Sequence, residues 1–140
     1  MINKFYIRDI NNSMKKLNFL LLSLILIILI SCSGSDTYRG KWKGMTLEGN
    51  KVEIIFKANK MILKDNSFKD VVHNYNQNSV NIENSIESYG IEIEDGRRYY
   101  IVFPIRNNED IGLILDENKN LLYSISRKEY INSKEIFKLN

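Results

Sequence analysis

The sequence predicts an all-β domain, a small antiparallel meander of about eight strands that closes into a barrel, behind a hydrophobic N-terminal segment. Three observations predict this class. Short runs alternate apolar and charged residues with a period of two, turn-forming residues separate these runs at roughly regular spacing, and the chain after residue 37 has no clear helical period. Such a pattern is typical of a barrel or a sandwich, and closure into a barrel removes exposed strand edges.

The first element, residues 19–30, is apolar except for Ser23. Lys15 and Lys16 precede it, and a serine and a cysteine follow it. A basic start, a short apolar core and a small-residue exit are typical of a secretory signal, whereas a membrane-spanning helix needs about 20 apolar residues. We therefore expect a cleaved signal helix over residues 1–31, for which Met14 is the more natural start. The alternatives are an uncleaved anchor, or a signal that ends beside a free cysteine by chance.

The end of this segment, Leu29-Ile30-Ser31-Cys32, resembles the lipobox of bacterial lipoproteins. The resemblance implies that Cys32 receives a diacylglycerol, that the signal is cut before Cys32, and that the new amino group is acylated, for example with palmitate. Stable anchoring takes two or more chains, because each buried methylene contributes about 0.8 kcal/mol. The expected partner is membrane lipid, and the protein is expected outside the bacterial membrane. Ser33 is not an aspartate-type retention signal, which favours the outer membrane or cell surface where an outer membrane exists.

Charge separates this leader from the rest of the chain. Lys4, Arg8, Lys15 and Lys16 stand against Asp9 in the leader, which accounts for the whole net charge of +3. The other 16 basic and 16 acidic residues balance, so the alkaline pI is no argument for nucleic-acid binding.

Cleavage would leave 109 of the 140 residues, enough for one domain with a modest core. Residues 32–36 are expected to be the lipidated anchor and a short polar linker, in which the four residues after Cys32 reach at most ~14 Å. The barrel domain is expected over residues 37–140. Cys32 is the only cysteine, so no intramolecular disulfide is possible.

Alternation predicts most of the strands. In the first, Tyr38, Gly40, Trp42 and Gly44 alternate with basic residues, which indicates a half-buried strand. The other expected strands, each between turn signals, are residues 52–56, 61–64, 80–83, 86–94, 98–105, 111–115 and 121–126.

Two turns and two irregular regions complete the prediction. Asp95-Gly96 predicts a type I′ turn, since both residues tolerate positive φ, and Pro104 should end the strand that contains it or lie at an edge. Residues 65–85, outside the strand at 80–83, form a long loop, with a strand or helical turn over 68–75 as the alternative. Near the C-terminus, residues 134–139 form a last strand, or residues 127–133 form a helical turn.

Gly40-Lys41-Trp42, at the start of the first strand, resembles the Gly-x-Trp signature of lipocalin-like (calycin) barrels. In that family the tryptophan packs across the closed end of the barrel. Phe137-Lys138 is similar to the aromatic–basic pair that ends the last strand of small bacterial lipocalin-like lipoproteins. The resemblance implies a lipocalin-like barrel, which either encloses a ligand cavity or is filled by its own side chains.

Six aromatic side chains fall on the inward phase of the expected strands. They are core residues first, and in a hollow barrel they would line a pocket for a small apolar ligand. These residues are Trp42, Phe56, Tyr89, Tyr99, Phe103 and Tyr123.

No group of residues has the spacing of a metal site. His73, the only histidine, lies in the polar middle region and is expected on the surface. With Cys32 committed to lipid, the usual zinc ligand sets are excluded. The loop at residues 116–120 begins like a calcium loop, but Leu121 and Arg127 stand where glycine and glutamate are required. We therefore expect a hairpin loop, and no metal or other cofactor.

The one candidate pair of catalytic carboxylates is Glu92 and Glu94. These residues alternate with inward-facing residues, so we expect them on the outer face, in cross-strand pairs with arginines.

Together these observations predict a lipid-anchored, exported protein that is not an enzyme. Its expected function is to bind a small apolar ligand or an envelope partner. The alternative is a surface adhesin or protein-interaction module with a filled barrel. A third option, a hydrolase of envelope glycans, requires two converging carboxylates.

Overall fold

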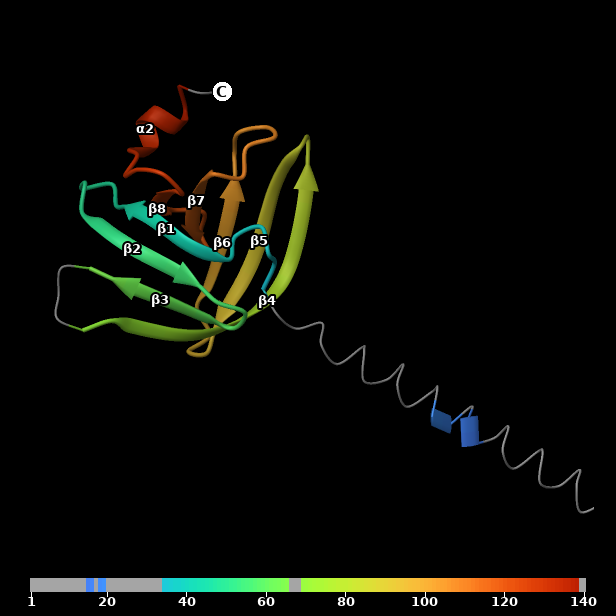
Figure 1. Cartoon of the computed structure of the whole chain (residues 1–140). Coiled ribbons are helices and arrows are strands. Elements are labelled where there is room, and N and C mark those ends of the chain that lie inside the picture. Colours follow the sequence, from blue (N-terminus) through green and yellow to red (C-terminus); the bar gives the residue numbers. More distant parts are fainter. Residues whose placement is uncertain (1–14, 17, 20–33, 66–68, 139–140) are drawn as a thin grey trace, which may run out of the picture. The chain divides into compact units, whose positions relative to one another are not determined.

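The computed structural model describes residues 15–16, 18–19, 34–65 and 69–138. Residues 33–140 form a compact unit of their own. Its described part contains eight strands and, after them, one short helix (Figure 1): β1 (Gly40–Met45), β2 (Lys51–Phe56), β3 (Lys60–Lys64), β4 (Val71–Glu83), β5 (Ile86–Ile93), β6 (Arg98–Phe103), β7 (Ile111–Asp116), β8 (Leu121–Ser126) and α2 (Ser133–Ile136).

The strands form a closed antiparallel barrel. Each strand pairs with the next along the chain, and β1 pairs with β8 to complete the ring. In this last ladder Lys43 lies opposite Ser126, and Met45 lies opposite Ser124. Closure confirms the predicted barrel and excludes the sandwich. The end of β6 at Phe103, directly before Pro104, is also as predicted.

Branched aliphatic side chains from five strands meet along the barrel axis. Ile54, Ile91, Ile101 and Ile125 are fully buried, and Ile114 is nearly so. Burying one such side chain contributes about 1.5–3 kcal/mol relative to leaving it in water. The inward residues of the meander therefore supply the main stability of the fold.

Most of the region expected to be a long loop instead belongs to the longest strand, β4 (Val71–Glu83). This strand includes the expected strand at residues 80–83 and, at residues 71–75, the strand that was the alternative to a loop. Its residues 71–74 pair with β3, and its residues 75–83 pair with β5. Backbone hydrogen bonds to these two neighbouring strands therefore stabilise β4. A register shift between Gln77 and Ser79 breaks the alternation, and Val80 and Ile82 are more than half exposed. The sequence pattern fails here because this strand buries few apolar side chains.

The type I′ turn is also misplaced in the prediction. At Asp95-Gly96 only Gly96 has positive φ, at 90°. The two successive residues with positive φ are Asn84 (51°) and Ser85 (66°), which join β4 to β5. A type I′ turn needs positive φ at both central residues. Serine is not a preferred residue at such a position, so this turn was not predicted.

Three hairpins instead share another turn, in which a single residue with positive φ follows the bend. These residues are Gly49 (87°), Gly96 (90°) and Lys119 (66°). In each turn, the N–H of this residue donates to the carbonyl three residues earlier, at 3.1, 2.9 and 3.0 Å. A three-residue hairpin loop with a bulge has this form.

These three turns lie at the same end of the barrel, because alternate connections of an antiparallel meander meet at one end. They join β1 to β2, β5 to β6, and β7 to β8. We call this end the mouth. The end where residues 34–39 lead into β1 beside the β2–β3 turn (Figure 1) we call the closed end. The β2–β3 turn is remote from the β1–β2 turn along β2, but it lies near the β5–β6 turn, because Asn59 and Gly96 line one surface pocket.

The expected last strand over residues 134–139 is wrong in its described part. Ser133–Ile136 form a short helix, α2. Asn132 accepts the N–H of Lys134 at 2.9 Å, and Glu135 accepts the N–H of Asn132 at 3.2 Å, which is a capping box. Ile136 is fully buried in a second apolar cluster with Leu113. The helical turn expected over residues 127–133 is not formed either.

Candidate functional site

Aromatic rings fill the half of the interior nearest the closed end. The ring of Tyr38 lies edge-on to those of Phe56 and Tyr89, each at 5.3 Å between centroids. The ring of Trp42 lies 6.0 Å from that of Phe103. Each of these five residues is at most 5% exposed. Edge-to-face packing of this kind contributes beyond the area that it buries, so the closed end is a well-packed core.

Arg127 covers Trp42. Its guanidinium lies 3.6 Å from the centre of the indole ring and donates to the carbonyl oxygens of Thr37 (2.9 Å) and Lys41 (3.2 Å). The indole N–H donates to the carbonyl of Tyr38 at 2.7 Å. Arg127 therefore ties the end of β8 to the chain that leads into β1.

The aromatic–basic pair expected at the end of the last strand has a different place in the structure. Phe137 and Lys138 follow α2 rather than ending a strand, and Phe137 is 61% exposed. Arg127 was not predicted as a functional residue, although its position directly after the expected strand at residues 121–126 was an available signal.

Three tyrosine hydroxyls are buried in or beside this aromatic core. The Tyr38 hydroxyl donates to the side-chain oxygen of Gln77 (2.8 Å), that of Tyr75 to the carbonyl of Lys57 (2.6 Å), and that of Tyr89 to Glu87 (2.6 Å). Burial raises the pKa of all three phenols above the usual value. The hydroxyls are therefore held neutral and act as structural donors.

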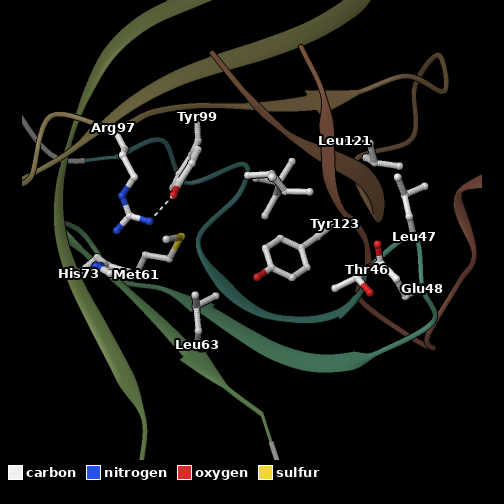
Figure 2. A pocket seen from close by; sticks show the side chains of 12 residues that line it. Thr46, Leu47, Glu48, Met61, Leu63, His73, Arg97, Tyr99, Leu121 and Tyr123 are labelled. Atoms are coloured by element: carbon white, nitrogen blue, oxygen red, sulfur yellow. Dashed lines mark hydrogen bonds between the residues drawn. The ribbon is translucent and has the colours of Figure 1, made fainter. Parts of the chain in front are cut away.

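The other half of the interior, towards the mouth, contains a cavity of about 420 Å³ (Figure 2). Ligand pockets for small molecules usually measure about 300–1,000 Å³. Its lining comes from β3, β4, β6, β7, β8 and the turns of the mouth: Thr46, Leu47, Glu48, Met61, Leu63, His73, Arg97, Tyr99, Ile114, Leu121, Leu122 and Tyr123.

The lining combines apolar side chains with polar ones, of which Glu48 and Arg97 are exposed and Thr46 and His73 are half-buried. Figure 2 shows the ring of Tyr123 in the middle of the cavity, with Leu63 and Met61 beside it. Burial raises the pKa of Tyr123, with a further contribution from Tyr99. Its phenol is therefore a neutral hydrogen-bonding group in a mostly apolar space.

Arg97, the cation nearest this cavity, is already paired. Its guanidinium donates to both carboxylate oxygens of Asp95, at 2.6 to 3.0 Å, and to the hydroxyl of Tyr99 at 2.9 Å. These hydrogen bonds from Arg97 lower the pKa of Asp95 to about 2. The pair adds polarity to the mouth but little net charge.

The structure divides the six aromatic residues predicted to line a pocket. Tyr99 and Tyr123 line the cavity. Trp42, Phe56, Tyr89 and Phe103 belong to the buried core below it.

The aliphatic floor of the cavity was not predicted as a site. It includes Met61, Leu63, Ile114 and Leu122. Inward alternation places such residues in the barrel, but it does not tell which of them border empty space.

The remaining candidates are placed as follows. His73 is half-buried at the edge of the cavity. Glu92 pairs with Arg98 at 3.1 Å, which confirms the predicted cross-strand pair, and Glu94 accepts a hydrogen bond from Asn74 at 2.7 Å. Among the described residues, no group of three or more His, Cys, Asp or Glu side chains is arranged to hold a metal ion.

The loop at residues 116–120 is a hairpin turn, as predicted. The carboxylate of Asp116 accepts the N–H groups of Asn118 and Asn120, each at 2.8 Å. These bonds hold the Asp116 side chain within its own turn.

The lipobox and Cys32 lie outside the described residues. Within the described part of the chain, no helix has the length and apolar character needed to cross a membrane. Comparisons of the chain with protein-family models, with curated proteins and with solved structures found no match.

Proposed function

We propose that this protein is an exported lipoprotein, anchored through Cys32, whose barrel binds a small, mostly apolar molecule without chemical conversion. The observation that carries the proposal is the cavity of about 420 Å³ at the mouth. Its aliphatic floor and the position of Gly40-Lys41-Trp42 at the start of β1 support the resemblance to lipocalin-like barrels.

The lining indicates the chemistry of the ligand. Met61, Leu63 and Ile114 favour an apolar body, because burying apolar area contributes about 25 cal/mol per Å². Tyr123 offers a neutral hydroxyl, and the charge of Arg97 is matched by Asp95. We therefore expect the ligand to be apolar with one uncharged polar group.

Binding can be measured on residues 33–140 with the fluorescent dye 1-anilinonaphthalene-8-sulfonate as the probe. We expect saturable enhancement of its fluorescence with one site per barrel. Leu63→Trp should weaken this binding at least severalfold, because the larger side chain fills the cavity.

Phe137→Ala, at an exposed position outside the barrel, is the matched control and should bind like the parent protein. Circular dichroism verifies that each variant is folded. Equal binding by the Leu63→Trp variant would place the dye elsewhere and remove the support for this cavity.

The proposed anchor has its own test. Protein made in bacteria from the full-length gene should partition with membranes and carry acyl chains on Cys32, as mass spectrometry would detect. Cys32→Ser should carry no acyl chains and should keep its uncut leader, so that its mass equals that of the full-length chain. Acyl chains or a cut before residue 32 in this variant would contradict lipidation at Cys32.

The interaction-module alternative is favoured by one observation, the exposed aliphatic side chains of β4. Val80 is 52% and Ile82 is 65% exposed. Val80→Ser with Ile82→Ser should abolish capture of an envelope protein by crosslinking in cells if this surface is the functional one. The glycan-hydrolase option is less favoured. Glu92 and Glu94 both line a separate surface pocket of about 310 Å³, but each carboxylate is already paired, with Arg98 and with Asn74.

A further inference from the structure

We propose that the closed end of the barrel, at the β2–β3 turn (residues 57–59), faces the lipid surface and that the mouth opens away from it. This inference rests on the proposed lipidation of Cys32. It is argued from the hydrogen bonds that Gly34 and Ser35, which follow Cys32 closely in the chain, make to the barrel.

The segment that leads into β1 is bound to the barrel from Gly34 onwards. The N–H of Gly34 donates to the carbonyl of Ala58 at 2.8 Å, and the N–H of Ser35 donates to the side-chain oxygen of Gln77 at 2.7 Å. Tyr38, which donates to the same oxygen of Gln77, is fully buried. The described part of the expected short polar linker, residues 34–36, is therefore part of the folded body.

The fit at Gly34 is tight enough to exclude a side chain. A Cβ added there would lie 2.4 Å from the hydroxyl oxygen of Tyr75 and 2.5 Å from that of Tyr38. Both hydroxyls are themselves held by hydrogen bonds, to Lys57 and Gln77. Glycine at this position thus lets the backbone pass directly over the two tyrosines, which fixes where the chain leaves the barrel.

Chain length then limits the distance between the anchor and this exit point. Cys32 is two residues before Gly34, so their Cα atoms are at most ~7 Å apart. An acylated Cys32 at the lipid surface therefore holds Ala58 and its turn close to the head groups. Lys57 and Lys60, both exposed on either side of this turn, suit the negative surface of an anionic membrane.

Strand β2 measures the separation of the turn at Ala58 from the β1–β2 turn of the mouth. It runs from the mouth, after the turn that contains Leu47, to Phe56, directly before the turn at Ala58. Its six residues extend about 17 Å at ~3.3 Å per residue. The β5–β6 turn lies nearer to Ala58, because Gly96 and Asn59 line one surface pocket.

With the turn at Ala58 against the lipid, the side of the cavity formed by Thr46, Leu47 and Glu48 faces the aqueous phase. The ligand then arrives from solution or from a partner rather than from the host bilayer.

The test uses the full-length lipidated protein in phosphatidylethanolamine–phosphatidylglycerol vesicles that contain a head-group nitroxide. Because lipidation consumes the natural thiol, Asn59→Cys and Leu47→Cys each add one reactive thiol for a fluorescent label. We expect quenching to be several times stronger for the label at residue 59 than for the label at residue 47. Equal quenching, or stronger quenching at residue 47, would overturn the proposed orientation.

Two variants test what causes the difference in quenching between the labels at residues 59 and 47. A ten-residue Gly-Ser insertion between Ser33 and Gly34 leaves the docked segment intact and should abolish the difference between the labels. Gly34→Val should also reduce it, by displacing the segment from Tyr38 and Tyr75. A difference unchanged by the insertion would mean that docking does not set the orientation. Failure of the anchor itself is distinguishable, because mass spectrometry would show an unmodified Cys32 and the vesicles would carry no protein.

Discussion

Arg127 joins the end of β8 to Trp42 and to the chain that leads into β1. Its guanidinium stacks on Trp42 at 3.6 Å and donates to the carbonyls of Thr37 and Lys41. A desolvated cation–π contact contributes about 2 kcal/mol, and hydrogen bonds from charged donors about 1.5–3 kcal/mol. We expect Arg127→Met to lower the free energy of unfolding by about 2–4 kcal/mol, measured in urea through Trp42 fluorescence.

Arg98→Met is the matched control for this prediction. Arg98 also pairs across strands, but its side chain is 59% exposed, and exposed ion pairs contribute about 0–1 kcal/mol. A loss of stability in Arg98→Met as large as that in Arg127→Met would show that the stacking of Arg127 on the indole ring does not account for its contribution to stability. Trp42 could be predicted as a core residue from its motif. The contact between Trp42 and Arg127 could not be predicted, because it depends on the pairing of β1 with β8.

Turn chemistry can be tested at the level of single hairpins. Ser85, at φ 66° in the β4–β5 turn, has a Cβ in the left-handed region, which is unfavourable by about 1–2 kcal/mol. Glycine removes this strain but is more flexible when unfolded. We expect Ser85→Gly to raise stability by about 0.5 kcal/mol, or the melting temperature by about 2–4 °C in a calorimetric scan.

The reciprocal change, Gly96→Ala, is the control. A Cβ at Gly96 meets no atom within 4 Å, and its φ is 90°, so any loss of stability is conformational rather than steric. We expect a loss of about 1 kcal/mol. Similar effects of the same sign at Ser85 and Gly96 would contradict the assignment of these turns.

Among the secondary-structure elements, the sequence pattern predicted the strands that have one buried face. It did not predict elements that lack such a face. In β4 the ladders to β3 and β5 replace apolar alternation as the source of order. At the C-terminus, the capping box of Asn132 and Glu135 outweighed the apparent strand pattern. In both regions hydrogen bonding decided the element, and hydrophobic periodicity cannot report hydrogen bonding.

The whole barrel should be sensitive to alkali. Tyr38, Tyr75, Tyr89 and Tyr123 converge from the segment before β1 and from β4, β5 and β8, and burial raises the pKa of each. Below pH ~10 they are protonated in both states and stability is unaffected. Above it the unfolded chain loses protons that the folded barrel retains, so stability falls with pH, by up to ~1.4 kcal/mol per unit for each group.

Urea titrations of residues 33–140 between pH 8 and 11 measure this slope. Tyr89→Phe should make the decline shallower, because one titrating group is removed. Tyr130→Phe, on the exposed surface, serves as the control. A decline that is equally steep in both variants would indicate another cause.

The sequence predicted the closed sheet, its strand number and most of its core, because these follow from local alternation and from the need to cover strand edges. It did not predict the division of the interior into a filled half and an open half. Whether Trp42 and Tyr123 border packed atoms or empty space depends on how eight strands stagger around the ring, and that stagger is not encoded in any single strand.

The shared turn geometry at the mouth has a consequence for engineering. The bends at Gly49, Gly96 and Lys119 are exposed short units, each closed by its own backbone hydrogen bond. Insertions and substitutions are tolerated best in such exposed loops. The bends at Gly49 and Lys119 are therefore suited to accept longer, grafted loops that reshape what the barrel recognises, whereas Gly96 shares a surface pocket with Tyr75 of the core.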